Sequence, residues 1–195
     1  MRAFIAIQPP MSVRSALYDA AAPLRSLALP VRWVQPEALH LTLAFLGRVE
    51  AAQVDPILEA MGDAVAARAP LDLTLRGLGA FPRRGDARVV WVGVEVPPSL
   101  GALRDDLTTR LELLGFPREA KEFAPHLTLG RSRRAAQRVV LPASPFDFGA
   151  TFVVEELVLM RSHTDPGGAR YERIAGVPIG VPLQRASPSR AGRER

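Results

Sequence analysis

The tetrapeptide His-Leu-Thr-Leu occurs twice in this chain of 195 residues, at 40–43 and at 126–129, and the two copies contain two of its three histidines. The copies lie 86 residues apart, and each follows the same series: a short apolar run, a Pro-Pro pair, a stretch with helical spacing and a loop. The apolar runs open at about Arg2 and Arg88, with the same offset. A pattern repeated at this length predicts two similar α+β lobes packed as one body about a pseudo-two-fold axis.

Each His-Leu-Thr-Leu segment is expected to be a β-strand with one buried face. Successive side chains of a strand point to opposite faces, so the leucines at 41, 43, 127 and 129 are predicted to anchor the strands in the core. The opposite face then presents His40 with Thr42, and His126 with Thr128. Imidazole and hydroxyl are about 6.6–7 Å apart along the strand, at roughly 3.3 Å of rise per residue. A pseudo-dyad would place both histidines around one pocket.

Two histidines and two hydroxyls around one pocket suit phosphoryl chemistry. Hydrolysis of a cyclic phosphodiester needs a base for the attacking water and an acid for the leaving ribose oxygen, and the ordinary histidine pKa near 6.5 makes both states accessible. Threonine hydroxyls donate hydrogen bonds to phosphate oxygens, and Arg131 is the candidate for balancing the negative charge. A lone His-x-Thr is usually only part of a strand, so it is the repetition in matching contexts that favours a site. Three scattered histidines without carboxylates at ligand spacing indicate no metal.

Other elements are predicted from periodicity and from the positions of proline and glycine. Helices are expected at 11–27 with a kink at Pro23, at 51–68, and from a Ser99 cap to Gly115. Strands are expected at 2–7, 31–34, 71–75, 87–96 and 146–160.

Composition limits the class of protein. Cysteine is absent, no apolar run reaches the roughly 18–20 residues that span a bilayer, and the N-terminus lacks a signal-peptide core, so a cytoplasmic protein without a membrane partner is predicted. Residues 1–182 are expected to form a single bilobal domain and 183–195 a disordered basic tail. The four arginines and one glutamate of 185–195 contribute +3 of the net charge of +5. Arginines at 83, 84, 131, 133, 134 and 138 are either a solvated face or an anion-binding surface.

Several other side chains are assessed for contact with a substrate. Four aromatic residues have the chemistry to stack on a nucleobase, but a core role is predicted for each: Trp33, Phe45, Phe81 and Trp91. The third histidine, His163, stands in the segment Ser-His-Thr-Asp-Pro-Gly-Gly and is predicted to lie in a loop.

Several stretches of the sequence resemble the 2H phosphoesterases and, within them, the RNA 2′,3′-cyclic phosphodiesterases of bacteria and archaea, also called 2′-5′ RNA ligases. The stretches are MRAFIAIQPP, WVQPEALHLTLAFLG, GLGAFPRRGDARVVWVGV, FAPHLTLGR and PGGARYERI, which extend from Met1 to about Ile174. The resemblance implies a bilobal α+β fold in which two antiparallel sheets form a central cleft. It also implies hydrolysis of RNA 2′,3′-cyclic phosphate ends to a 2′-phosphate without a cofactor, and a weak, reversible 2′-5′ joining of tRNA halves.

The resemblance also implies roles for individual residues. Carried over by position, His40 is the proton donor to the leaving 3′ oxygen and His126 is the proton acceptor that activates water. Thr42 and Thr128 hold the phosphate, and Arg131 corresponds to an arginine that often follows the second motif. Because both histidines stand in the same tetrapeptide, the residues alone leave open which is the acid and which is the base.

Two alternatives remain at this stage. The first keeps the chemistry but changes the substrate to a small cyclic nucleotide or an ADP-ribose cyclic phosphate. The second is a non-catalytic protein that binds RNA ends through the same cleft. In either case the expected protein is a monomer.

Overall fold

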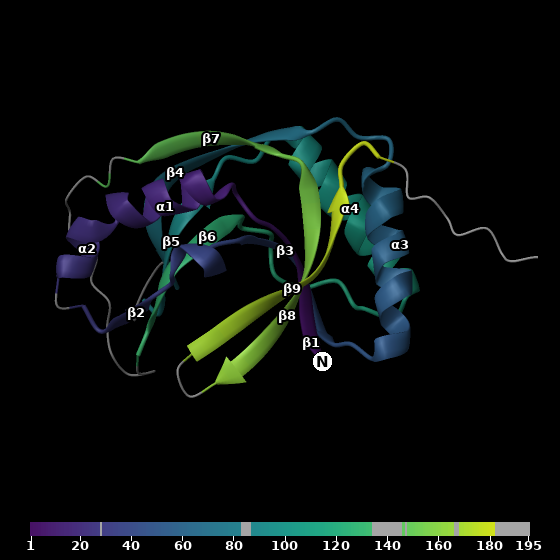
Figure 1. Cartoon of the computed structure of the whole chain (residues 1–195), viewed down its shortest axis with the longest axis horizontal. Coiled ribbons are helices and arrows are strands. Elements are labelled where there is room, and N and C mark those ends of the chain that lie inside the picture. Colours follow the sequence, from purple (N-terminus) through teal and green to yellow (C-terminus); the bar gives the residue numbers. More distant parts are fainter. Residues whose placement is uncertain (28, 83–86, 134–145, 147, 166–167, 182–195) are drawn as a thin grey trace, which may run out of the picture.

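The computed structural model describes residues 1–27, 29–82, 87–133, 146, 148–165 and 168–181, so the predicted tail at 183–195 lies outside the described residues. In this part of the chain, strands form one antiparallel sheet with helices packed on it (Figure 1). The strands are β1 (Arg2–Ile7), β2 (Val31–Trp33), β3 (Leu41–Arg48), β4 (Leu71–Phe81), β5 (Val89–Val94), β6 (His126–Ser132), β7 (Gly149–Val154), β8 (Glu156–Asp165) and β9 (Gly168–Pro178). The helices are α1 (Met11–Ala20), α2 (Ala22–Ser26), α3 (Val54–Val65) and α4 (Pro98–Leu113), with 3₁₀ turns η1 (Pro36–Ala38) and η2 (Ala51–Gln53). No helix in these ranges combines the length and apolar character needed to cross a bilayer.

The sheet consists of two halves that meet at the two His-Leu-Thr-Leu segments. Its strand order is β7-β4-β5-β6-β3-β1-β8-β9, with β2 also paired to β6. The central strands β3 and β6 share one residue pair, Leu41 with Leu127. The two antiparallel sheets expected from the sequence are therefore the halves of one continuous sheet, joined at a single point.

The two halves repeat each other down to a local irregularity of the strand pairing. Between β1 and β3 the pairing passes from Ile5–Ala44 to Ala6–Thr42, so Leu43 is skipped. Between β5 and β6 it passes from Val90–Gly130 to Trp91–Thr128, so Leu129 is skipped. Both skipped residues are the last leucine of the motif. Each strand therefore contains a β-bulge at the same place, and the repeat of sequence pattern is also a repeat of structure.

Helices α1 and α4 are exchanged between the halves of the sheet. Helices α1 and α2 lie on the side of β4 to β7, while α3 and α4 lie on the side of β1, β3, β8 and β9 (Figure 1). Helix α1 is held there by Arg14, whose Nη1 donates to the carbonyl oxygens of Pro36 (3.1 Å) and Glu37 (3.0 Å) in η1. Helix α1 follows β1 and α4 follows β5, so each packs with the half opposite to its preceding strand, whereas α3 stays with the half of β3. One apolar core runs through both halves.

Five details of the secondary structure differ from the expectations. The helix predicted at 11–27 is divided at Ala21, because Pro23 occupies the first turn of α2, where its missing N–H group costs no hydrogen bond. Helix α4 begins at Pro98 with no side-chain cap, so the predicted Ser99 cap is wrong. The strand predicted at 146–160 is replaced by β7 and β8, and the strand predicted at 71–75 continues to Phe81. Strand β9 was not predicted.

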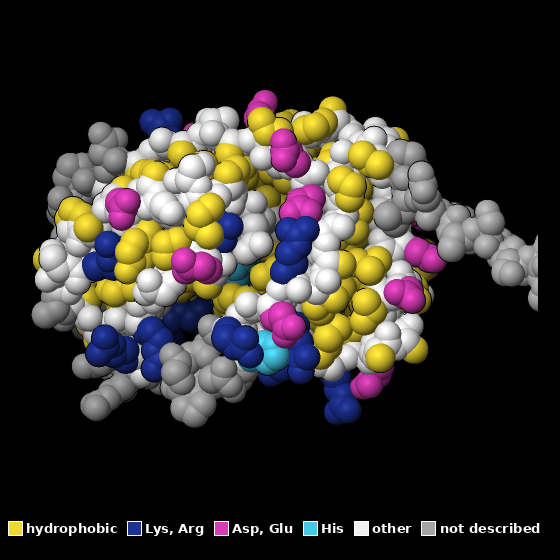
Figure 2. Space-filling model, in the orientation of Figure 1, with side chains coloured by type: hydrophobic (Ala, Val, Ile, Leu, Met, Phe, Trp, Pro, Cys, Tyr) yellow, Lys and Arg dark blue, Asp and Glu magenta, His cyan; other side chains and the backbone are white. Residues whose placement is uncertain are grey.

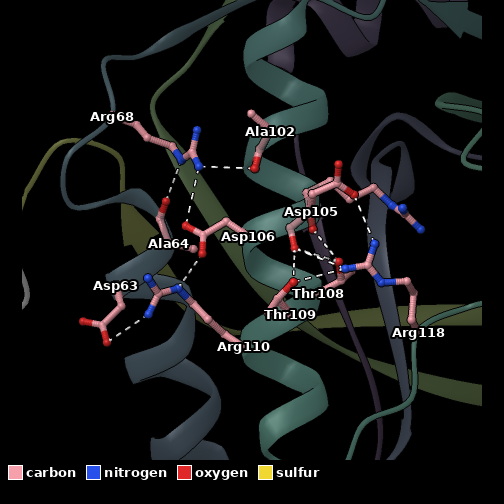
Figure 3. A network of polar contacts seen from close by, with 11 residues as sticks. Asp63, Ala64, Arg68, Ala102, Asp105, Asp106, Thr108, Thr109, Arg110 and Arg118 are labelled. Atoms are coloured by element: carbon pink, nitrogen blue, oxygen red, sulfur yellow. Dashed lines mark hydrogen bonds and ion pairs between the residues drawn. The ribbon is translucent and has the colours of Figure 1, made fainter.

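A network of charged side chains fastens α3 to α4 on the outer surface (Figure 3). Asp106 on α4 accepts from Arg68 Nη2 at 3.5 Å and from Arg110 Nε at 2.9 Å, and Arg110 also reaches Asp63 on α3 at 3.4 Å. Arg118, after the helix, contacts Asp105 at 3.3 Å. Single exposed ion pairs contribute little to stability, so we infer that this network mainly fixes the position of α4.

Candidate active site

The predicted division of each motif into a buried and an accessible face is confirmed. Leu41, Leu43, Leu127 and Leu129 are all less than 5% exposed. The two histidines and two threonines are partly exposed. His40 directly precedes β3, and His126 is the first residue of β6. The leucines therefore hold each strand in the core and leave the imidazoles and hydroxyls on the opposite face.

The Leu41–Leu127 pair brings the two motifs together. Leu41 and Leu127 occupy the same position of each motif, so this pair relates the two motifs by a local two-fold axis. His126 acts electrostatically on His40, which places the two imidazoles near each other.

Both imidazole rings are fixed by the same backbone contact. His40 Nδ1 is 2.7 Å from the carbonyl oxygen of Ala38, and His126 Nδ1 is 2.7 Å from that of Ala124. A carbonyl oxygen only accepts, so Nδ1 carries the hydrogen in each case. The atom that gains or loses a proton is therefore Nε2, as acid–base chemistry at this face requires.

Each histidine also lies against two aromatic rings. His40 is 4.8 Å from the ring centroids of both Phe4 and Tyr171. His126 is 5.0 Å from that of Phe81 and 6.2 Å from that of Trp91. These contacts restrict the orientation of the imidazoles and remove water from around them.

The surroundings disfavour the charged form of both imidazoles. The pKa of His40 is lowered to about 4, chiefly by burial and also by Arg131 and His126, against the raising effect of the hydrogen bond to the Ala38 carbonyl. Burial likewise lowers the pKa of His126, with Arg131 acting in the same direction. Two consequences follow: both histidines are neutral at pH 7 in the free protein, and Arg131 acts on both of them.

The bulge in β6 places Arg131 on the histidine face. Arg131 stands three residues after Thr128, so strict alternation would turn it toward the leucine face. The pairs across the bulge are Thr128–Trp91, Gly130–Val90 and Arg131–Val89. Because the partners of Thr128 and Arg131 are two residues apart on β5, these two side chains share a face. Arg131 is exposed there, beside both motifs.

The bulge in β3 does the same for Phe45, the residue 86 positions before Arg131. Phe45 pairs with Phe4, and their ring centroids are 6.0 Å apart. Phe45 is 55% exposed, so the core role predicted for it is wrong.

Trp33 packs against the core as predicted. Phe81 and Trp91 are only partly buried and lie against His126, so their predicted core role is also incomplete.

The buried Arg104 of α4 contacts segments that belong to both motifs. Its Nε donates to the carbonyl oxygen of Leu43, the bulged residue, at 3.3 Å. Its guanidinium lies 4.4 Å from the ring centroid of Phe123, three residues before His126. Arg104 is 8% exposed, and none of the described carboxylates forms an ion pair with it. This side chain was missed because nothing in its sequence surroundings distinguishes it from the other arginines of the helix.

His163 does not lie in a loop, because the β8–β9 pairing continues through it. It stands in β8, and its Nε2 is 2.7 Å from Glu172 Oε2. Tyr171, the neighbour of Glu172, lies against His40, so alternation directs Glu172 and His163 to the other face of the hairpin. Tyr171 was missed from the sequence, because β9 itself was not predicted.

The fold and the site together define a class. One antiparallel sheet that brings two His-x-Thr motifs together on one face, with an arginine beside them, is the arrangement of a 2H phosphoesterase. The family model described as the 2′-5′ RNA ligase superfamily matches residues 12–166. The chain belongs to this superfamily, so the resemblance and the fold class stated from the sequence are confirmed.

Named relatives agree with this assignment. A Geobacillus stearothermophilus protein named RNA 2′,3′-cyclic phosphodiesterase is 38% identical over 158 residues, which are 79% of this chain; the match covers 50% of that relative, so this chain spans about half its length. An Archaeoglobus fulgidus protein of the same name is 34% identical over 175 residues, covering 88% of this chain and 97% of the relative. The solved structure of Escherichia coli LigT complexed with 3′-AMP has a TM-score of 0.73 and 29% identity, covering 91% of this chain and 97% of that one.

Proposed function

We propose that this protein hydrolyses the 2′,3′-cyclic phosphate at the end of an RNA strand to a 2′-phosphate. The observation that carries the proposal is the Leu41–Leu127 pair, which joins the two motifs at the same position and leaves His40 and His126 close enough to interact electrostatically. Both imidazoles have Nε2 available, since Nδ1 is bound to backbone. The names of the relatives support the cyclic phosphate as substrate.

The proposed reaction is an in-line displacement at phosphorus. His126 Nε2 accepts a proton from water as the water oxygen attacks the phosphorus atom. The bond from phosphorus to the 3′ oxygen breaks, and His40 Nε2 gives its proton to that oxygen, which leaves a 3′-hydroxyl and a 2′-phosphate. Thr42 and Thr128 donate hydrogen bonds to the non-bridging oxygens, and Arg131 balances their charge. With an RNA 5′-hydroxyl in place of water, the same steps would give a 2′-5′ linkage, so the proposal includes a weak, reversible ligation.

The donor must be protonated before it reacts. In the free protein the pKa of His40 is about 4, so the proton must be taken up as the substrate binds. The negative phosphodiester supplies the cause, because an opposite charge within a few ångströms raises the pKa of an imidazole.

The test uses an oligonucleotide that ends in a 2′,3′-cyclic phosphate, with the product followed by phosphorus NMR. A 2′-phosphate is expected, and either an unchanged substrate or a 3′-phosphate would contradict the proposal. Replacing His40 or His126 singly by alanine should lower the rate by at least about 10² in each case. His163→Ala is the matched control, since His163 lies on the other face of its hairpin, and it should retain the rate.

A small cyclic nucleotide is the second candidate substrate, because the LigT structure was solved with a mononucleotide. Competition between a short RNA and adenosine 2′,3′-cyclic phosphate separates the two. A non-catalytic binder of RNA ends would bind linear 2′-phosphate ends and show no turnover with either substrate.

We further infer that the protein acts as a monomer and accepts the cyclic ends of tRNA halves. The monomer is supported by the site itself, since both motifs and Arg131 come from one chain. Light scattering at the assay concentration tests the monomer, and turnover of a tRNA half with a cyclic end tests the substrate.

A further inference from the structure

We propose that Arg32 binds the phosphate on the 5′ side of the terminal nucleotide, so that the site holds two consecutive phosphates of an RNA strand. The inference rests on the proposed function and deepens it. The cyclic phosphate lies at the histidines, and the next phosphate of the strand lies on β2.

The first step is the position of Arg32. Strand β2 pairs with β6, and Arg32 is the direct partner of Arg131. Its neighbours Val31 and Trp33 pack into the core, so alternation turns Arg32 to the opposite face. Arg131 is on that face too, as the bulge in β6 requires. The two guanidinium-bearing side chains therefore project side by side from adjacent strands, on the face of the histidines.

The second step is electrostatic. Like charges directly opposite each other on a sheet destabilise it. Both arginines are exposed, and within the described ranges neither forms an ion pair with a carboxylate. Arg133 is exposed just after β6, two residues from Arg131, and adds a third positive charge on the same face. An uncompensated cluster of this kind beside a phosphate site is explained by an anion that occupies it.

The third step assigns the two arginines to different phosphates. Arg131 is close enough to both histidines to lower the pKa of each, whereas Arg32 lies one strand farther out. We therefore assign the reacting phosphate to Arg131, and a phosphate farther along the ligand to Arg32. Basic side chains gather over β2 and beside the β8–β9 hairpin on this face of the molecule (Figure 2). An RNA strand supplies a phosphate next to its terminal nucleotide, but a nucleoside cyclic phosphate has none.

The experiment compares one substrate that lacks the additional phosphate with two substrates that carry it. They are adenosine 2′,3′-cyclic phosphate, the same compound with a 5′-phosphate, and the dinucleotide ApA with a 2′,3′-cyclic end. In Arg32→Ala, kcat/KM should fall about tenfold for the second and third, in line with a charged hydrogen bond, and stay unchanged for the first. The salt dependence of log kcat/KM for the dinucleotide should become shallower by about 0.7, the value for one contact to a single strand.

Arg161→Ala is the matched control, because Arg161 is an exposed arginine of β8 in the other half of the sheet. It should leave all three substrates unaffected. An equal loss on the nucleoside cyclic phosphate, or no loss on the dinucleotide, would overturn the proposal. Arg32→Ala should not lower the midpoint of thermal unfolding, whereas a structural role predicts a decrease.

A binding measurement keeps this result separate from the proposed function. The dissociation constants of adenosine 2′-phosphate and of ApA ending in a 2′-phosphate are measured by calorimetry for both proteins. Arg32→Ala should weaken only the dinucleotide, whether or not the protein turns over a cyclic substrate. If the wild type hydrolyses no cyclic end, the proposed function fails while this comparison still decides the role of Arg32.

Discussion

Arg104 donates its Nε hydrogen to the carbonyl oxygen of Leu43, so a buried charge on α4 is bound to the residue of the first motif that the strand pairing skips. The same guanidinium stacks on Phe123 in the segment that leads to His126. A buried guanidinium without a carboxylate partner carries a desolvation cost. We infer that Arg104 serves to position the site, because it contacts the bulge in the first motif and the segment that leads to the second.

Arg104→Met should therefore lower kcat by at least about tenfold while changing the free energy of unfolding by less than about 2 kcal/mol. The lost hydrogen bond and cation–π contact are each worth about 1–2 kcal/mol, and removing a buried charge offsets part of that loss. Stopped assays and urea unfolding measure the two effects. Arg118→Met, which removes a more exposed arginine next to the same helix, should retain both. A large loss of stability with unchanged kcat would show that Arg104 is only structural.

The sequence was sufficient for the parts of the site that depend on alternation within one strand. Alternation along the strand is enough to place the histidine and threonine of each motif on the face opposite to its leucines. The 86-residue offset identified the two copies as a pair. The repeat also predicted that the two copies meet around one pocket, and Leu41 pairs with Leu127.

The remaining parts depend on departures from alternation and on long-range packing, which single segments do not encode. The bulges turn the side chains of Arg131 and Phe45 to the face opposite to the one that strict alternation predicts. Leucine at the two bulged positions does not itself indicate a bulge. Tyr171 reaches His40 from a strand more than 120 positions away in the sequence. For the same reason the packing of α1 and α4 on the half opposite to their preceding strands was not foreseen.

His40→Asn should make stability less dependent on pH. The pKa of His40 is about 4 in the folded protein and about 6.5 in an unfolded chain, so only the unfolded state gains this proton as the pH falls from 6.5 to 4. The contribution is complete above pH 6.5 and is lost as the pH decreases; between pH 7 and pH 5 it amounts to about 2 kcal/mol. Urea unfolding of wild type and variant at both pH values measures it. Parallel pH dependences for the two proteins would contradict the lowered pKa of His40.

Phe45→Ala should raise KM for a nucleotide substrate by about tenfold or more. Its exposed ring lies on the histidine face, where a terminal base can stack on it, and such stacking is worth about 1–3 kcal/mol per base. Phe45→Trp should preserve the KM. Leu113→Ala, which removes another exposed apolar side chain but on α4, is the control and should have no effect. Equal behaviour of the two alanine variants would exclude Phe45 from binding.

The pH profile of kcat/KM should have its maximum below pH 6.5. This parameter reports the free protein, in which the pKa of His40 is about 4 and that of His126 is also lowered from its usual value. The reaction needs one imidazole protonated and the other neutral, a state most populated between the two pKa values. The rate should therefore fall as the pH rises through the upper pKa and fall again as the pH drops through the lower one. A profile that peaks above pH 7 would show that at least one histidine has an unperturbed or raised pKa, and the lowering of both pKa values by burial would then be wrong.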